Sequence, residues 1–185
     1  MKYKKLTGVI LKKQNYKEAD QIITLWTREA GKVRVLARSV RLPKAKLCYS
    51  VQDLCLVEID LAGRGNMMTL IGSKIIKQFK NLMTDLPKAS KGFYAAELMM
   101  KMTADEHPNP QAFDLLVEFL TRQNKNMSVN DYSGVDEFAL RLADTLGFGS
   151  PEGAGSHKSV KEFIQDLIER ELHTDKLLTE LIINP

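Results

Sequence analysis

The sequence predicts an α+β fold in which a small closed β-sheet is followed by an all-helical bundle. Five short runs rich in β-branched and aromatic residues fill the first 80 of the 185 residues, with no helical pattern between them. After about residue 82, apolar residues recur at intervals of three and four, as on one face of a helix. We therefore expect two domains, covering residues 1–80 and 81–185.

The five expected strands cover residues 6–13, 21–27, 31–38, 53–62 and 66–77. The fourth alternates between apolar and acidic residues, which predicts one buried and one solvent-facing side. The segment AGRGN before the fifth run predicts a hairpin turn, because no helix pattern follows it to form a phosphate-binding loop. Five short strands without intervening helices favour a five-stranded OB-fold barrel, and an SH3-like barrel is the alternative.

Helices are expected at residues 88–102, from Pro110 onward, and at 135–146, 160–168 and 175–183. Asp131 or Ser133 is a suitable N-cap for the third of these, and Ser156 or Ser159 for the fourth. Their apolar stripes predict the core of a bundle, in which one groove could also accept a peptide. The acidic residues of these helices fall on polar faces and are interpreted as solvated surface.

The charge is divided unevenly along the chain. Residues 1–80 hold 17 Lys and Arg against 6 Asp and Glu, a net charge of +11, whereas residues 81–185 hold 10 against 17, a net charge of −7. A basic first half predicts a polyanionic partner. The alternative is that the acidic half neutralises the basic one within the molecule.

The stretch ARSVRLPKAKL concentrates this positive charge at the end of the third strand. Between Ala30 and Gln52 there are six basic residues and no acid: Lys32, Arg34, Arg38, Arg41, Lys44 and Lys46. The first three share the outward face of the strand and the others continue into the loop, a pattern typical of a surface that follows a phosphate backbone. Four more residues extend this candidate DNA-binding surface: Lys12, Lys13, Lys17 and Arg28.

Aromatic residues for base stacking are scarce in the first half. Tyr16, Trp26 and Tyr49 are the candidates, and Trp26 shares a strand face with Ile22 and Thr24, as a core residue would. Affinity is therefore expected to come mainly from phosphates, which makes it sequence-tolerant and salt-dependent. A general RNA or DNA binder and a protein adaptor whose basic loop meets an acidic partner both remain alternatives.

No pattern in the sequence predicts an enzyme, a cofactor or a metal. Walker A, GxSxG and HExxH motifs are absent, and the three histidines are scattered. Cys48 and Cys55 match no common zinc spacing and are expected to be reduced, partly buried thiols. No apolar run is long enough for a membrane span or a signal sequence, so a cytoplasmic protein without membrane contact is expected.

The region 15–47, NYKEADQIITLWTREAGKVRVLARSVRLPKAKL, resembles the RecO family of bacterial recombination-repair mediators. In that family a Tyr-x-Glu-x-Asp segment, here Tyr16 to Asp20, leads into a strand. A Thr-x-x-x-Gly turn, here Thr27 to Gly31, precedes a strand that ends in Ala-Arg and a basic loop. The segments YAAELMMKM, FALRLADTLGF and KSVKEFIQDLIERELHTDKLL are similar to the family's helices, so the resemblance covers most of the chain.

The resemblance implies an OB fold that binds single- and double-stranded DNA and anneals complementary strands. It also implies help in loading RecA, together with RecR, onto DNA coated by single-stranded DNA-binding protein, in the bacterial cytoplasm at the nucleoid. The acidic C-terminal tail of single-stranded DNA-binding protein is expected to dock on the helical half. Because this half is acidic, its few cations, such as Lys101, Arg122, Lys125 and Arg141, would have to gather there.

The chain departs from the family pattern in two places. Family members usually have Gly and Ser where this chain has Ser39 and Ala45. Many members also carry a four-cysteine zinc cluster after the LGF helix, where this chain has the cysteine-free segment GSPEGAGSHKS. We expect no zinc here, and the chain looks shortened at this point.

Overall fold

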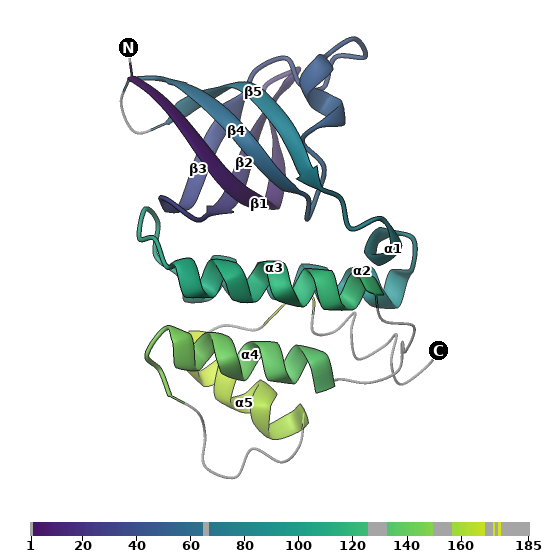
Figure 1. Ribbon diagram of the computed structural model, residues 1–185, viewed down its shortest axis with the longest axis vertical. Coiled ribbons are helices and arrows are strands. Elements are labelled where there is room, and N and C mark those ends of the chain that lie inside the picture. The colour runs from purple at the N-terminus through teal and green to yellow at the C-terminus, as the bar shows by residue number, and fades with distance from the viewer. Residues whose placement is uncertain are drawn as a thin grey trace. The chain divides into compact units, whose positions relative to one another are not determined.

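The computed structural model describes residues 2–64, 67–125, 133–149 and 157–168, together with Leu172 and Thr174 (Figure 1). The chain forms two compact units. One contains Met1–Gln78 and Ala104–Pro110, and the other contains Phe79–Thr103 and Gln111–Pro185. The short segment 104–110 thus groups with the strands, although it lies between two helices in the sequence. The division into two domains near residue 80 stays a prediction.

The first unit is a closed β-barrel (Figure 1). Its strands are β1 (Lys2–Tyr16), β2 (Asp20–Thr27), β3 (Gly31–Ala37), β4 (Leu56–Gly63) and β5 (Met68–Lys77). The order around the barrel is β1-β2-β3-β5-β4, and every pairing is antiparallel except the closure between β3 and β5. This connectivity is that of an OB fold, which confirms the predicted barrel and excludes the SH3-like alternative.

Strand β1 is longer than expected because it serves two partners. Its first half pairs with β4, from Lys2 to Val9, and its second half pairs with β2, from Gly8 to Tyr16. The strand changes partner around Gly8, where a Cβ would lie 2.8 Å from the Thr27 side chain. A mid-strand glycine therefore allows the close approach that closes the barrel.

Strand β4 begins three residues later than the alternating pattern predicts. Leu54 has a positive φ of 59°, which turns the chain before the ladder begins at Leu56. Leu54 is nevertheless fully buried, and its N–H donates to the Ile10 carbonyl at 2.9 Å. Leu54, which the expected strand places on the solvent-facing side with Glu58 and Asp60, thus belongs to a buried turn.

The barrel interior holds the apolar residues of alternating positions. Its main members are Leu6, Ile10, Ile23, Leu25, Val35, Val57, Ile59, Leu61 and Leu70. Trp26 is only 1% exposed and so offers no surface for base stacking. Both thiols are free; Cys48 is half-buried, and burial, reinforced by the Asp53 carboxylate, raises the pKa of the Cys55 thiol.

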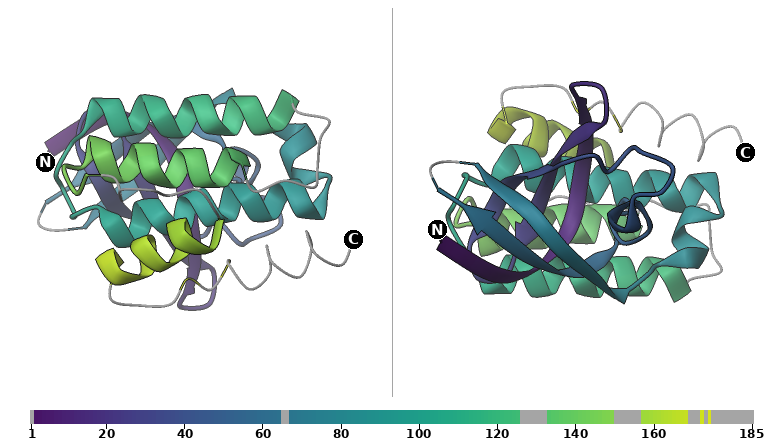
Figure 2. Two further views of the ribbon diagram at one scale, coloured as in Figure 1. Left: turned by 90° about the horizontal axis from the view of Figure 1, so that it is seen from below. Right: turned by 90° about the horizontal axis from the view of Figure 1, so that it is seen from above.

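The second unit contains the helices (Figure 2). They are α1 (Lys80–Met83), α2 (Leu86–Met102), α3 (Pro110–Lys125), α4 (Ser133–Thr145) and α5 (His157–Ile168). The short α1 was not predicted, and α2 begins two residues early because the Asp85 carboxylate accepts from the Lys88 N–H. Asp131, Ser156 and the expected helix 175–183 lie outside the described residues. None of the described helices has the length and apolarity needed to cross a bilayer.

Helix α4 packs against α2 and α5, and its Phe138 ring lies 4.7 Å from that of Phe119 on α3. Most acidic side chains of these helices are exposed, as expected, but Glu97 on α2 is buried. Its carboxylate accepts hydrogen bonds from the N–H and the hydroxyl of Thr174, at 2.9 and 2.5 Å. Glu97 is therefore a structural group within the bundle and not part of its solvated surface.

Candidate nucleic-acid interface

The basic stretch leaves β3 as a loop that is anchored to the barrel at both ends. Val40 and Val51 are buried in the barrel core, and between them lies a short 3-10 helix, Lys46–Tyr49. Leu47 and Cys48 of this helix pack against the same core. The loop is thus an ordered extension of the barrel, and its polar side chains are left to face solvent.

The turn between β1 and β2 holds the start of this loop in place. The Asp20 carboxylate accepts from the Ser39 N–H at 2.7 Å, and the Ala19 carbonyl accepts from the Arg41 N–H at 3.0 Å. The Arg41 guanidinium also donates to the Glu18 carbonyl at 3.0 Å. Arg41, expected only as a phosphate contact, therefore also ties the loop to the turn.

Three of the expected cations meet around one depression of about 320 Å³, which we call the basic hollow. Arg38, Lys44 and Lys46 line it, and its apolar surface comes from Leu42, Ala45 and Leu47. Among the described residues, no acidic side chain forms an ion pair with these three cations. Uncompensated cations in a shallow, open site suit a phosphodiester, which needs positive charge and access from solvent.

The other expected cations are arranged differently. Lys32 and Arg34 on β3 both contact the carboxylate of Asp105, and Lys13 pairs with Asp53 at 3.1 Å. The run that lacks acids in the sequence is therefore not free of acids in space. Asp105 comes 71 residues after Arg34, and nothing in the sequence pattern connects the two.

The remaining three expected residues, Lys12, Lys17 and Arg28, are exposed around β1 and β2. The Lys17 ammonium lies over the Tyr16 ring, 5.4 Å from its centroid. Of the three candidate aromatic residues, Tyr16 and Tyr49 remain available for stacking, at 41% and 69% exposure, and Tyr3 on β1 is exposed as well, at 68%. With so few platforms, phosphate contacts stay the main source of the expected affinity.

Ser39 occupies a backbone position that favours glycine, since its φ is 54°. Glycine, which the family resemblance implies at this position, would adopt this conformation without strain. We expect Ser39→Gly to raise the free energy of unfolding by about 0.5–1 kcal/mol, because glycine relieves the left-handed strain. Urea unfolding measures the change. Ser39→Ala is the control and should give no gain; equal stabilisation by both would contradict the explanation.

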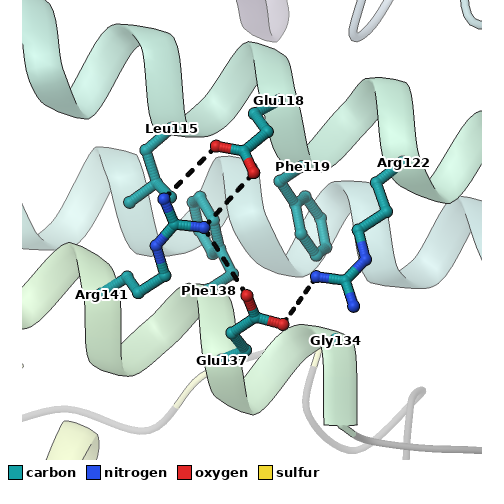
Figure 3. Close-up of a pocket in the computed structure, with 8 residues that line it drawn as sticks. All are labelled: Leu115, Glu118, Phe119, Arg122, Gly134, Glu137, Phe138 and Arg141. Carbon is teal, nitrogen blue, oxygen red and sulfur yellow. Dashed lines mark hydrogen bonds and ion pairs between the residues drawn. The ribbon is translucent and has the colours of Figure 1, made fainter.

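The helical unit contains a second charged site, the helical hollow between α3 and α4, with room for little more than a water molecule (Figure 3). Leu115, Phe119, Gly134 and Phe138 supply its walls, and Glu118, Arg122, Glu137 and Arg141 form its rim. Arg122 pairs with Glu137 at 2.6 Å, and Arg141 bridges Glu118 at 3.3 Å and Glu137 at 3.6 Å. Two positive and two negative side chains thus alternate around the rim, above walls that contain two aromatic rings.

Of the four cations expected to gather in the helical half, two lie at the helical hollow and two lie elsewhere. Arg122 and Arg141 do come together at the helical hollow. Lys101 instead pairs with Glu97 on its own helix, at 3.0 Å, and Lys125 is exposed at the end of α3. Within the described part of the chain, no group of three His, Cys, Asp or Glu side chains is placed to hold a metal ion.

The barrel and its basic loop define an OB-fold protein with a surface suited to phosphates. Comparison with the models of known protein families shows to which family this OB-fold protein belongs. Residues 1–79 match the model of the recombination protein O N-terminal region, and residues 83–152 match that of its C-terminal region. The two matches follow each other along most of the sequence, and the chain belongs to the RecO family.

Individual relatives agree with this assignment. The chain is 31% identical to the DNA repair protein RecO of Halalkalibacterium halodurans over 125 residues, which is 68% of this chain and 49% of the relative. Identity to the protein of the same name from Dehalococcoides mccartyi is 35% over 116 residues, 63% of this chain and 46% of the relative. Identity to the DNA repair protein RecO of Listeria monocytogenes serotype 4b is 26% over 143 residues, which is 77% of this chain and 55% of the relative. The chain thus spans about half the length of these curated relatives.

Proposed function

We propose that this chain is a DNA-binding recombination-repair mediator whose barrel holds DNA by its phosphates. The observation that carries the proposal is the basic hollow, where Arg38, Lys44 and Lys46 face solvent without an acidic partner among the described residues. Membership of the RecO family supports DNA as the polyanion. The role is one of binding, and the proposal involves no catalytic step.

Strand annealing follows from the physics of this surface. Cations that neutralise phosphates lower the repulsion between two single strands. Few exposed aromatics compete for the bases, so the base edges stay free to pair with a complementary strand. We further propose, from the family resemblance, that the protein assists RecA loading together with RecR on DNA coated by single-stranded DNA-binding protein.

The proposal is tested by annealing complementary oligonucleotides over a series of salt concentrations. We expect the affinity for single strands to fall by about 0.7 log units per log unit of salt for each phosphate contacted, and annealing to slow in parallel. Binding that does not respond to salt would contradict the proposal. A preference for RNA in direct competition would favour a general nucleic-acid binder. Charge reversal at Arg38, Arg41 and Lys44 that leaves DNA binding unchanged would favour a protein adaptor.

A second proposal concerns the helical hollow, as a docking site for the acidic C-terminal tail of single-stranded DNA-binding protein. Arg122 and Arg141 lie at its rim, and Phe119 and Phe138 lie in its wall (Figure 3). An acidic peptide would meet the two arginines at the rim; because Phe119 and Phe138 are buried, its apolar end could enter only if the two rings move apart. Because Glu118 and Glu137 already occupy the two arginines, the peptide carboxylates would have to replace them.

The double variant Arg122→Ala/Arg141→Ala is expected to weaken binding of a tail peptide to the full chain about two- to fivefold, since Glu118 and Glu137 already occupy both cations and the peptide gains only the difference between two sets of carboxylate contacts. Fluorescence anisotropy of a labelled peptide measures the affinity. Lys125→Ala on the same helix is the control and should bind the peptide as the unaltered chain does. Equal loss in both variants, or no loss in the double variant, would place the tail elsewhere.

A further inference from the structure

The segment Ala104–Pro110 lies against the first residues of β3. Its backbone forms an isolated parallel bridge with the strand at Lys32 and Asp105, and the Glu106 N–H donates to the Lys32 carbonyl at 2.9 Å. The backbone of His107 passes so close to Gly31 that a Cβ there would lie 2.3 Å from the His107 carbonyl oxygen. These backbone contacts hold the segment on the strand and do not involve the Asp105 side chain.

The Asp105 carboxylate uses this position to contact two cations at once. One oxygen lies 3.3 Å from the Lys32 ammonium and the other lies 2.9 Å from the Arg34 guanidinium. The Lys32 side chain is only 12% exposed, while Arg34 and Asp105 are 61% and 48% exposed. An ammonium and a guanidinium around one pair of oxygens is also the geometry with which proteins bind a phosphate.

Because the Asp105 carboxylate lies between Lys32 and Arg34, it lowers the free energy that a phosphate can gain by binding to these two cations. A partly exposed anion between two cations can leave without breaking the barrel, because water can take its place. A phosphate that binds there must displace the carboxylate, so one charge-assisted contact is exchanged for another and little is gained. At the basic hollow, by contrast, no acid among the described residues competes with a phosphate.

We propose that Lys32 and Arg34 form a phosphodiester-binding subsite for which the chain's own Asp105 carboxylate is a built-in competitor. The subsite stays closed to weak encounters and opens when a nucleic-acid strand, already held at the basic hollow, displaces the carboxylate. This inference rests on the proposed DNA binding. It adds that a carboxylate of the chain itself lowers the affinity for DNA.

The variant Asp105→Asn tests the proposal, because asparagine preserves the size of the side chain and removes only its charge. We expect it to bind a labelled oligothymidylate about 3- to 10-fold more tightly at low salt. The log–log salt dependence should steepen by about 0.7 for each cation that gains a phosphate. Asp144→Asn on α4 makes the same change in net charge and should leave the salt slope as it is.

A cycle with Lys32→Ala/Arg34→Ala localises the effect. In the unaltered background this pair should cost less than about twofold, because Asp105 already occupies both cations; in the Asp105→Asn background it should remove the whole gain. An unchanged affinity and salt slope in Asp105→Asn, with a lowered melting temperature, would overturn the proposal and leave Asp105 as a structural clamp.

A readout without DNA separates this inference from the proposed function. Titration with inorganic tripolyphosphate should shift the NMR signal of the Arg34 Nε–H group, and should do so at lower concentration in Asp105→Asn. If this holds while the unaltered chain binds no DNA, the subsite stands and the proposed function falls. No shift of Arg34 in either variant overturns the subsite.

Discussion

Replacing Arg38, Lys44 and Lys46 together by alanine is expected to lower the affinity for a single-stranded oligonucleotide roughly 10- to 100-fold at low salt. The basic hollow would lose all three of its cations, and with them about three counterions released on binding. The slope of log affinity against log salt should therefore fall by about 2. Fluorescence anisotropy over a salt series measures both quantities, and the annealing rate should drop with them.

The matched control removes the same charge from another part of the barrel unit. Lys2, Lys4 and Lys74 are exposed residues of β1 and β5, and their triple alanine variant makes an equal change in net charge. It should lose little affinity, since a general effect of net charge is weaker than loss of direct phosphate contacts. If the two triple variants behave alike, the basic hollow is not the site. Circular dichroism establishes that both remain folded.

Gly31→Ala is expected to destabilise the protein by about 3 kcal/mol or more, a large share of the stability of a typical domain. Gly31 has a φ of 68°, in the left-handed region. The new Cβ would also lie 2.3 Å and 2.5 Å from the carbonyl oxygen and carbon of His107, which are backbone atoms that cannot rotate away. The Thr27 hydroxyl donates to the Gly31 carbonyl at 2.8 Å, so a shift of the Gly31 backbone would also disturb the hydrogen bond that closes the turn.

Gly147→Ala separates the two causes. Gly147 also has a positive φ, of 85°, but no atom lies within 4 Å of the position of its Cβ. Alanine there should cost only about 1 kcal/mol, from the backbone conformation alone. Urea unfolding of the two variants gives the difference. Equal destabilisation would mean that the contact between Gly31 and His107 contributes nothing.

The sequence alone predicted the class of fold and most of its elements. The alternation of Cys55, Val57, Ile59 and Leu61 identified the buried face of β4, because a strand has a period of two and one side must face the core. The helical stripes that contain Phe113 and Phe138 did the same for the bundle. Local periodicity was sufficient wherever one face of an element is buried.

Sequence periodicity does not predict the turns or the ends of the strands. Leu54 lies within the expected fourth strand, on the side of Glu58 and Asp60, yet it is buried in a turn with a positive φ. The extension of β1 to both neighbours depends on its pairing with β2 and β4, which no single-strand pattern contains. Pairing partners are decided by the closed barrel as a whole.

For the candidate site, the sequence determined which residues carry the positive charge and that they follow one strand into one loop. Only the tertiary structure decided what each of them does. It placed Arg38, Lys44 and Lys46 around one open hollow, used Arg41 to hold the Glu18 carbonyl, and set Asp105 against two cations of β3. The physical reason is that an ion pair depends on distance in space, and a carboxylate 71 residues away in the chain can be a nearest neighbour in the fold.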